Sequence, residues 1–235
     1  MSAPTALLLD AVGTLIRLHE PPAETYLRVA RRHGIERPRA ELERDLGLAL
    51  SRLRPPRCDD GRLDAMPARE REGWRGVIRE SLGDAAADGP CFAALWEHYA
   101  QPVAWEVQPG AGAALAAARA DGLQLAIVSN MDARLPALLD ALGFPAFDAL
   151  VVPSNCGHAK PDGRIFAAAL ARLGRRPSEA LYVGDRDKDC VDSACAAGVR
   201  GLRYDPSAAR TGDGVLRAWS ELCSATPRPG LDSRA

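Results

Sequence analysis

The sequence predicts an α/β fold: a doubly wound parallel sheet interrupted by an inserted helical domain. Two observations predict the sheet. Short unbroken apolar runs end at polar residues or glycine, and helical stretches separate these runs. Such runs are typical of strands that are buried on both faces, and their alternation with helices is typical of parallel sheets. The third observation is a long region, residues 17–106, with helical patterns and no predicted strand.

Four segments fit buried strands, and a helical stretch follows or precedes each of them. The predicted strands are 6–10 (ALLLD), 123–128 (LQLAIV), 149–152 (ALVV) and 180–183 (ALYV). The predicted core helices are 109–120, 132–142, 161–173 and 187–197. Pro161 is expected at a helix start, and Gly143, Gly174 and Gly198 just beyond helix ends.

The interrupting region predicts a cap domain joined to the core by two hinges. Amphipathic helical patterns occupy 22–33, 39–53, 67–82 and 91–100, with a loop at 54–62. We therefore expect a Rossmann-like core formed by 1–16 and 107–223, a helical cap at 17–106 and a disordered tail at 224–235.

Composition excludes several classes of protein. The 235 residues are 47% hydrophobic and 26% charged, as in ordinary globular proteins. The net charge of -1 gives no electrostatic indication of binding to nucleic acid or to an anionic membrane, and no apolar stretch approaches the ~20 residues of a membrane span. The six cysteines show no metal-binding spacing, so we expect free thiols and a cytoplasmic protein; they are Cys58, Cys91, Cys156, Cys190, Cys195 and Cys223.

Polar residues follow the ends of the predicted strands in a particular order. Asp10 ends the first strand, Ser129 and Asn130 follow the second, Lys160 comes after the third, and Asp185 follows the fourth. Because the carboxyl ends of parallel strands share one edge of the sheet, these side chains are expected to converge. Lys160 is one of only two lysines, the other being Lys188, which makes a random surface position less plausible.

These motifs resemble those of the haloacid dehalogenase (HAD) superfamily of hydrolases over residues 6 to 203. The four matching motifs are DAVGTL, IVSN, KPD and VGDRDKD. The stretches DAVGTL, SNMDARLPALL and KPDGRIF further resemble the subfamily of haloacid dehalogenase-like hydrolase domain-containing protein 3. The resemblance implies a HAD core with a helical cap, and phosphoryl transfer from a small phosphorylated metabolite.

The resemblance also implies a role for each motif residue. Asp10 would be the nucleophile that forms an aspartyl intermediate, and Lys160 would neutralise the charge of Asp10 and the phosphate. Gly13 would allow a turn, and Thr14, Ser129 and Asn130 would bind phosphoryl oxygens, helped by backbone N–H groups.

A magnesium ion is the implied cofactor, because Mg²⁺ prefers oxygen ligands. Asp10, the backbone carbonyl of Val12 and Asp185 would bind it. For the further acid, the sequence offers Asp187, Asp189 and Asp192. Asp189 is favoured, since the alternative spacing falls on Cys190, a poor ligand for magnesium, while Asp187 could cap the next helix.

Val12 is the departure from the phosphatases of this superfamily, which carry a second Asp at this position. That Asp protonates the leaving alcohol and activates water, and valine does neither. Losing such general acid–base help typically costs ~10²–10⁴ in rate. His19 and Glu20, near the first hinge, are candidates to replace it.

Four hypotheses follow. The first is a slow or substrate-restricted phosphatase, and the second is a 2-haloacid dehalogenase, which Val12 and Asp185 both disfavour. The third, a phosphonatase, needs a cap lysine, and residues 17–106 contain none. The fourth is a non-catalytic protein that binds a phosphometabolite or a partner. The aromatic residues Trp74, Trp96, Tyr99 and Trp105 are expected to pack the cap, and one of them could line the pocket between cap and core. Oligomeric state is not predicted.

Overall fold

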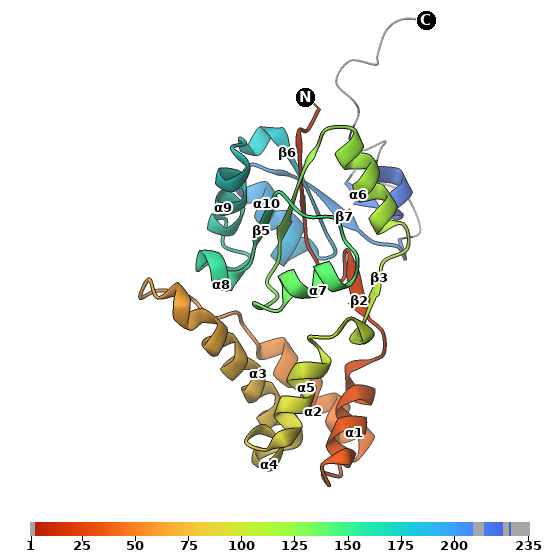
Figure 1. The fold of residues 1–235 in the computed structure, drawn as a ribbon, viewed down its shortest axis with the longest axis vertical. Helices are drawn as coiled ribbons and strands as arrows, with labels where there is room; N and C mark the ends of the chain where they lie inside the picture. The colour runs from red at the N-terminus through yellow and green to blue at the C-terminus, as the bar shows by residue number, and fades with distance from the viewer. Residues whose placement is uncertain (1–2, 209–213, 223–225, 227–235) are drawn as a thin grey trace, which may run out of the picture.

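The computed structural model describes residues 3–208, 214–222 and 226, and the side chains of 188 and 189 are outside this description. Strands and helices alternate from β3 to β7, whereas α1 to α5 follow one another without a strand between them (Figure 1). In order they are β1 (Ala6–Leu9), β2 (Ile16–Leu18), α1 (Pro22–Arg32), α2 (Arg39–Arg52), η1 (Leu63–Ala65), α3 (Met66–Leu82), α4 (Asp84–Ala87), α5 (Pro90–His98), η2 (Pro102–Ala104), β3 (Trp105–Val107), α6 (Ala111–Ala120), β4 (Gln124–Val128), α7 (Leu135–Ala141), β5 (Ala149–Val151), α8 (Pro153–Cys156), α9 (Arg164–Leu173), η3 (Pro177–Glu179), β6 (Ala180–Gly184), the π-helical η4 (Asp187–Val191), α10 (Asp192–Ala196), β7 (Arg200–Tyr204), β8 (Val215–Leu216) and η5 (Trp219–Glu221).

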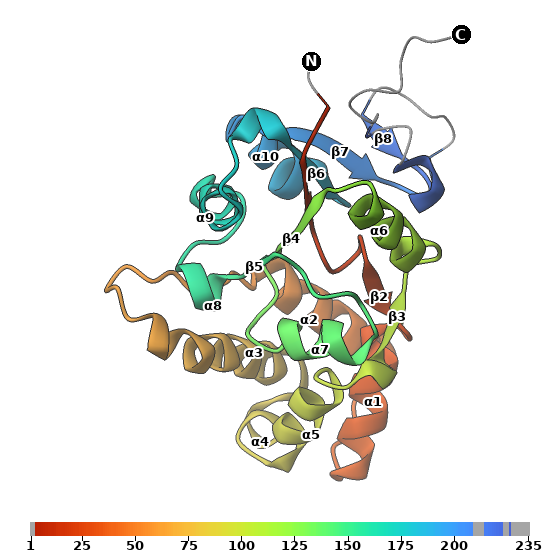
Figure 2. The same ribbon diagram turned by 45° about the horizontal axis from the view of Figure 1, so that its top comes forward.

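A six-stranded parallel sheet in the order β5-β4-β1-β6-β7-β8 forms the core. Helices α6 and α7 cover one face and α9 and α10 the other (Figure 2). Every residue of β1 is fully buried, because apolar side chains on both of its faces pack against these helices. The predicted fold class, an α/β core with a doubly wound parallel sheet, is confirmed.

Two strands of the sheet were not predicted. β7 carries Arg200 and Arg203 and is only partly buried, and β8 has two residues. Near the edge of the sheet a strand needs no unbroken apolar run, so the pattern that identifies central strands is absent there.

The helical insertion, residues 19–104, has a hydrophobic core of its own. Side chains from α1 to α5 form this core, and it is separate from the two cores that flank the sheet. In Figure 1 these helices lie below the sheet. Its loop at 54–62 contains no helix or strand, as expected.

A two-stranded antiparallel ribbon joins the helical insertion to the core. β2 pairs with β3, with Leu18 opposite Trp105 and Arg17 opposite Glu106. The expectation of no strand in 17–106 is therefore wrong at both ends of that range. The ribbon is too short to show an alternating pattern, and an ion pair between Arg17 and Glu106 helps to join its strands.

Pro161 does not begin a helix, contrary to the prediction. It follows Lys160 through a cis peptide bond, and α9 starts at Arg164. The Asp162 carboxylate accepts the backbone N–H of Arg164 at 2.9 Å. Asp162 therefore provides a hydrogen-bond partner for an N–H group of the first helical turn, which has no partner within the helix. Gly143, Gly174 and Gly198 do lie beyond helix ends with positive φ, as predicted.

No helix among the described residues is long and apolar enough to cross a membrane. The five cysteines within the described chain are free thiols, as the spacing predicted. The tail predicted at 224–235 falls outside the described residues, except Thr226, whose hydroxyl donates to the Leu222 carbonyl.

Candidate functional site

The turn after β1 holds Asp10 in a fixed position. The Asp10 carboxylate accepts the backbone N–H of Ala11 at 2.8 Å, and the chain then turns at Gly13, whose φ is 87°. A side chain at Gly13 would collide with Asp185, because a Cβ there would lie 2.2 Å from the Asp185 Oδ2. Glycine is therefore required both by the backbone angle and by the close approach of Asp185.

Lys160 forms a buried ion pair with Asp10. Its Nζ lies 2.8 Å from Asp10 Oδ2, and the two residues are 5% and 4% exposed. Two groups that are distant in the sequence therefore meet at the carboxyl end of β1, as expected. The Asp10 carboxylate therefore lies against a fixed cation at the edge of the sheet.

Asn130 positions Lys160 through the backbone. Its side-chain amide donates to the Lys160 carbonyl at 2.9 Å, and its Oδ1 accepts the Lys160 N–H at 2.7 Å. These two hydrogen bonds fix the orientation of the amide and leave one N–H of its NH₂ group for the predicted phosphate contact.

Ser129 and Thr14 occupy different surroundings. Ser129 lines the cavity described below, and its hydroxyl accepts the Met131 N–H at 3.2 Å. Thr14 is fully buried, outside the cavity lining, and its hydroxyl makes no hydrogen bond with the described residues. The structure thus brings Ser129, but not the Thr14 hydroxyl, to the open side of the site.

Tyr182 and Cys190 complete the surroundings of the ion pair, and the sequence did not indicate them as site residues. Lys160 Nζ donates to the Tyr182 hydroxyl at 3.0 Å and to Cys190 Sγ at 3.4 Å, and the Cys190 thiol donates to Asp10 at 3.3 Å. Burial raises the pKa of Cys190 to about 11, so it remains a thiol. The position of Cys190, five residues after Asp185, was the sequence feature that could have indicated its place at the site.

Among the described residues, Asp10, Asp185 and Cys190 form a cluster that could hold a metal ion, with one ligand atom from each lying within 4.8 Å of the others. The Asp185 Oδ1 is buried and has no hydrogen-bond partner among the described residues. Burial and the charge of Asp10 raise the pKa of Asp185. A hard cation would satisfy both carboxylates, whereas the thiol is a poor ligand for Mg²⁺. The two carboxylates therefore fit magnesium.

The predicted acid Asp189 lies in η4, and its side chain falls outside the described part of the chain. Asp187 does not cap the following helix: its carboxylate lies 3.4 Å from Arg203 Nη1.

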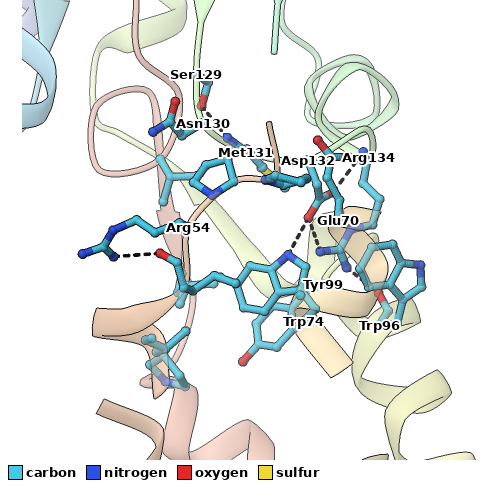
Figure 3. Close-up of a pocket in the computed structure, with 18 of the residues that line it drawn as sticks. Arg54, Glu70, Trp74, Trp96, Tyr99, Ser129, Asn130, Met131, Asp132 and Arg134 are labelled. Atoms are coloured by element: carbon cyan, nitrogen blue, oxygen red, sulfur yellow. Dashed lines mark hydrogen bonds and ion pairs between the residues drawn. The ribbon is translucent and has the colours of Figure 1, made fainter. Parts of the chain in front are cut away.

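A cavity of about 520 Å³ opens over Asp10 and Lys160 and extends into the helical insertion. Figure 3 shows Ser129, Asn130 and Met131 at one end and the rings of Trp74, Trp96 and Tyr99 at the other. All four aromatic residues singled out in the sequence, Trp105 included, line it.

The loop after β4 joins the core to the helical insertion. Ala133 donates its N–H to Glu70 at 2.9 Å, and Trp74 Nε1 donates to Asp132 at 2.9 Å. Arg134 pairs with Asp132 at 2.6 Å and donates to the Trp96 carbonyl at 2.8 Å (Figure 3). Burial raises the pKa of Glu70 to about 7.

Val12 lines the same cavity with a side chain that is 37% exposed. The two candidates to replace its missing carboxylate lie elsewhere. His19 pairs with Glu106 at 2.8 Å, Glu20 accepts from Thr25 at 2.5 Å, and both line a second, smaller hollow. Neither lines the cavity over Asp10.

A family model of haloacid dehalogenase-like hydrolases matches residues 4–194. The chain belongs to this family. The haloacid dehalogenase-like hydrolase described here is 33% identical over 185 residues to haloacid dehalogenase-like hydrolase domain-containing protein 3 of Homo sapiens, covering 76% of this chain and 73% of that protein. The resemblance inferred from the motifs is confirmed.

Two further comparisons extend the family assignment. Over 144 residues this hydrolase is 36% identical to a phosphoserine phosphatase of Thermus thermophilus, covering 60% of this chain and 56% of that protein. The crystal structure of a HAD phosphatase from Thermococcus onnurineus superimposes with a TM-score of 0.67 at 23% identity, covering 96% of this chain and 100% of the other. At 23% identity, this structural similarity supports the fold of the hydrolase and nothing more specific.

Proposed function

We propose that this hydrolase is a magnesium-dependent phosphatase that acts on a small phosphorylated metabolite through an aspartyl-phosphate on Asp10. The observation that carries the proposal is the buried Asp10–Lys160 pair at the base of the cavity. An ionised carboxylate beside a fixed cation is suited to attack a phosphorus centre, since the cation offsets the charge of the incoming phosphate. The relative named phosphoserine phosphatase supports the same reaction class.

The reaction has two displacements. The Asp10 carboxylate attacks phosphorus, and the bond from phosphorus to the ester oxygen breaks, leaving the electron pair on that oxygen. Water then attacks phosphorus, inorganic phosphate departs, and the Asp10 carboxylate is restored. Lys160 balances the negative charge throughout. Val12 neither donates a proton to the leaving oxygen nor accepts one from water, so these protons are exchanged with solvent and turnover is slow.

Magnesium, when bound, would supply further positive charge against the phosphoryl oxygens. Asp10 and Asp185 would hold it, together with the Val12 carbonyl and Asp189. The phosphoryl oxygens would bind Ser129 and the backbone N–H groups near Gly13 and Asn130. We further propose that the helical insertion acts as a cap that selects the substrate, because it supplies the cavity wall opposite Asp10.

The test compares wild-type protein with Asp10→Asn. Both are incubated with Mg²⁺ and a panel of phosphate esters that includes phenyl phosphate, and released phosphate is measured. We expect at least a ~10³-fold lower rate for Asp10→Asn, because an amide is a poor nucleophile. Equal slow release by both proteins from every ester would reject catalysis and favour a phosphometabolite-binding protein. Release of halide from 2-chloropropionate without metal would favour a dehalogenase.

A further inference from the structure

The cavity over Asp10 is lined by an unusually high share of the aromatic residues in the chain. Of four tryptophans, four tyrosines and four phenylalanines in the sequence, half line this one cavity. They are Tyr26, Trp74, Phe92, Trp96, Tyr99 and Trp105. Leucine and proline side chains from the helical insertion fill much of the remaining wall. The surface opposite Asp10 is therefore mostly apolar.

Several polar groups of this wall are already bound within the protein. Arg134 is held by Asp132 and lies 3.6 Å from the ring centre of Trp96. Trp105 Nε1 donates to the Tyr99 carbonyl at 3.1 Å. Arg54 donates to the carbonyls of two residues of its own segment, Ser51 and Leu53 (Figure 3). The Arg134 and Asp132 side chains and the Trp105 indole N–H are therefore engaged within the protein, whereas a flat apolar group would contact the ring surfaces of this wall.

The chemistry at Asp10 leads to the same class of substrate. Val12 supplies no proton, so the leaving oxygen must depart as an anion. An aliphatic alkoxide is a poor leaving group, because alcohols resemble water, whose pKa is about 16. A phenolate is a far better one, because a phenol has a pKa of about 10. An aromatic leaving group would thus fit the cavity and also make a general acid unnecessary.

We propose that the substrate is an aryl phosphate monoester, with the phosphoryl group at Asp10 and the aromatic ring against Trp74 and its aromatic neighbours. The inference rests on the proposed function and specifies its substrate class. The Asp10 carboxylate forms a bond to phosphorus, the phosphorus–oxygen bond to the ring breaks, and the phenolate takes a proton from water.

Three substrates separate ring recognition from leaving-group reactivity. Phenyl phosphate has both the ring and a good leaving group, benzyl phosphate has the ring alone, and acetyl phosphate has a good leaving group alone. With Mg²⁺, we expect KM to be about tenfold lower for the two ring substrates than for acetyl phosphate. We expect kcat to be at least about tenfold higher for phenyl and acetyl phosphate than for benzyl phosphate.

Trp74→Ala tests the ring contact directly. It should raise KM about fivefold or more for phenyl and benzyl phosphate and leave KM for acetyl phosphate within about twofold. Leu48→Ala is the control, because Leu48 is exposed on α2 and lies outside the cavity lining. Equal KM values for all three substrates, or a uniform effect of Trp74→Ala on them, would overturn the inference.

A binding measurement distinguishes this failure from failure of the proposed function. Quenching of tryptophan fluorescence compares phenylphosphonate with methylphosphonate, neither of which is hydrolysed. Tighter binding of phenylphosphonate that is lost in Trp74→Ala supports the ring contact even if Asp10→Asn and wild type show the same phosphate release. Equal binding of the two phosphonates overturns the inference, whatever the catalytic result.

Discussion

Val12 is the residue that most restricts the proposed chemistry. Its side chain faces the cavity beside Asp10 and carries no ionisable group. His19 contacts Glu106 and Glu20 pairs with Arg28, both outside this cavity, so they do not replace it. The two proton transfers of the proposed reaction therefore lack a protein group at this position.

Val12→Asp should raise phosphatase turnover. An aspartate there would protonate a poor leaving group and then activate water, and such catalysis typically contributes ~10²–10⁴ in rate. We expect the largest gain with benzyl phosphate and a smaller gain with phenyl phosphate, measured as kcat with Mg²⁺. Val12→Asn, similar in shape to aspartate but unable to exchange protons, should show no gain. No increase in a folded Val12→Asp protein would contradict the prediction.

Gly13→Ala should reduce stability more than a loss of backbone freedom explains. Alanine at φ 87° costs about 1 kcal/mol, and its Cβ would also press against Asp185, which typically adds about 1–3 kcal/mol. Gly34→Ala is a matched control, because φ is 72° there and no atom lies within 4 Å of the added Cβ. Urea unfolding measures both variants, and equal losses would contradict the role of Asp185.

The residue types of the site were more predictable than their partners. The position of Lys160 after a strand, and its rarity, were enough to expect a role beside Asp10. The contacts of Lys160 with Tyr182 and Cys190 were not predictable, because they depend on how β6 and η4 pack together. Asn130 was expected at the site, but its hydrogen bonds to the Lys160 backbone depend on the path of a loop.

At the scale of elements, predictability follows burial. The central strands β1, β4 and β6 are almost wholly buried, so their sequences are unbroken apolar runs and their positions were predicted to within one or two residues. The amphipathic helices α1, α2 and α3 were predicted for a related reason, since one face of each packs into a core.

Short or exposed elements have no such constraint. The ribbon of β2 and β3 is three residues long on each side, and exposed charged side chains stabilise it, among them Arg17 and Glu106. The predicted domain boundaries at 16/17 and 106/107 fall inside these two strands. Pairing between segments so distant in sequence cannot be recognised from either segment alone.

At the scale of the whole molecule, the helical insertion contacts the core through a buried acid. Glu70 on α3 is 5% exposed and accepts the N–H of Ala133 in the loop after β4. The charge of Asp132 raises the pKa of Glu70 further, while the Ala133 hydrogen bond and Arg134 act in the opposite direction. Since the net pKa is about 7, we expect the contact between the two parts to depend on pH near neutrality.

Glu70→Gln should remove a pH-dependent part of the stability. The pKa of Glu70 in the folded protein, about 7, lies above its ordinary value of 4.5, so the folded state binds this proton more tightly than the unfolded state. The resulting stability is present below pH 4.5 and is lost as the pH rises through 7. We expect the free energy of unfolding to fall by about 2–3 kcal/mol between about pH 5 and pH 8 in wild type. The fall should be smaller in Glu70→Gln.

Urea unfolding at a series of pH values measures this difference. Glu36→Gln, a change at an exposed position of the helical insertion, is the control and should keep the wild-type dependence. The same fall in Glu70→Gln as in wild type would show that another group is responsible.

The pairing of Leu18 with Trp105 has a consequence for how such a protein can change over generations. The two ends of the helical insertion lie side by side. The segment between them can therefore change in length or sequence without moving β1 or Asp10. Under the proposed function, mutations in this segment would alter which substrate is accepted and would leave the proposed nucleophile, Asp10, unchanged.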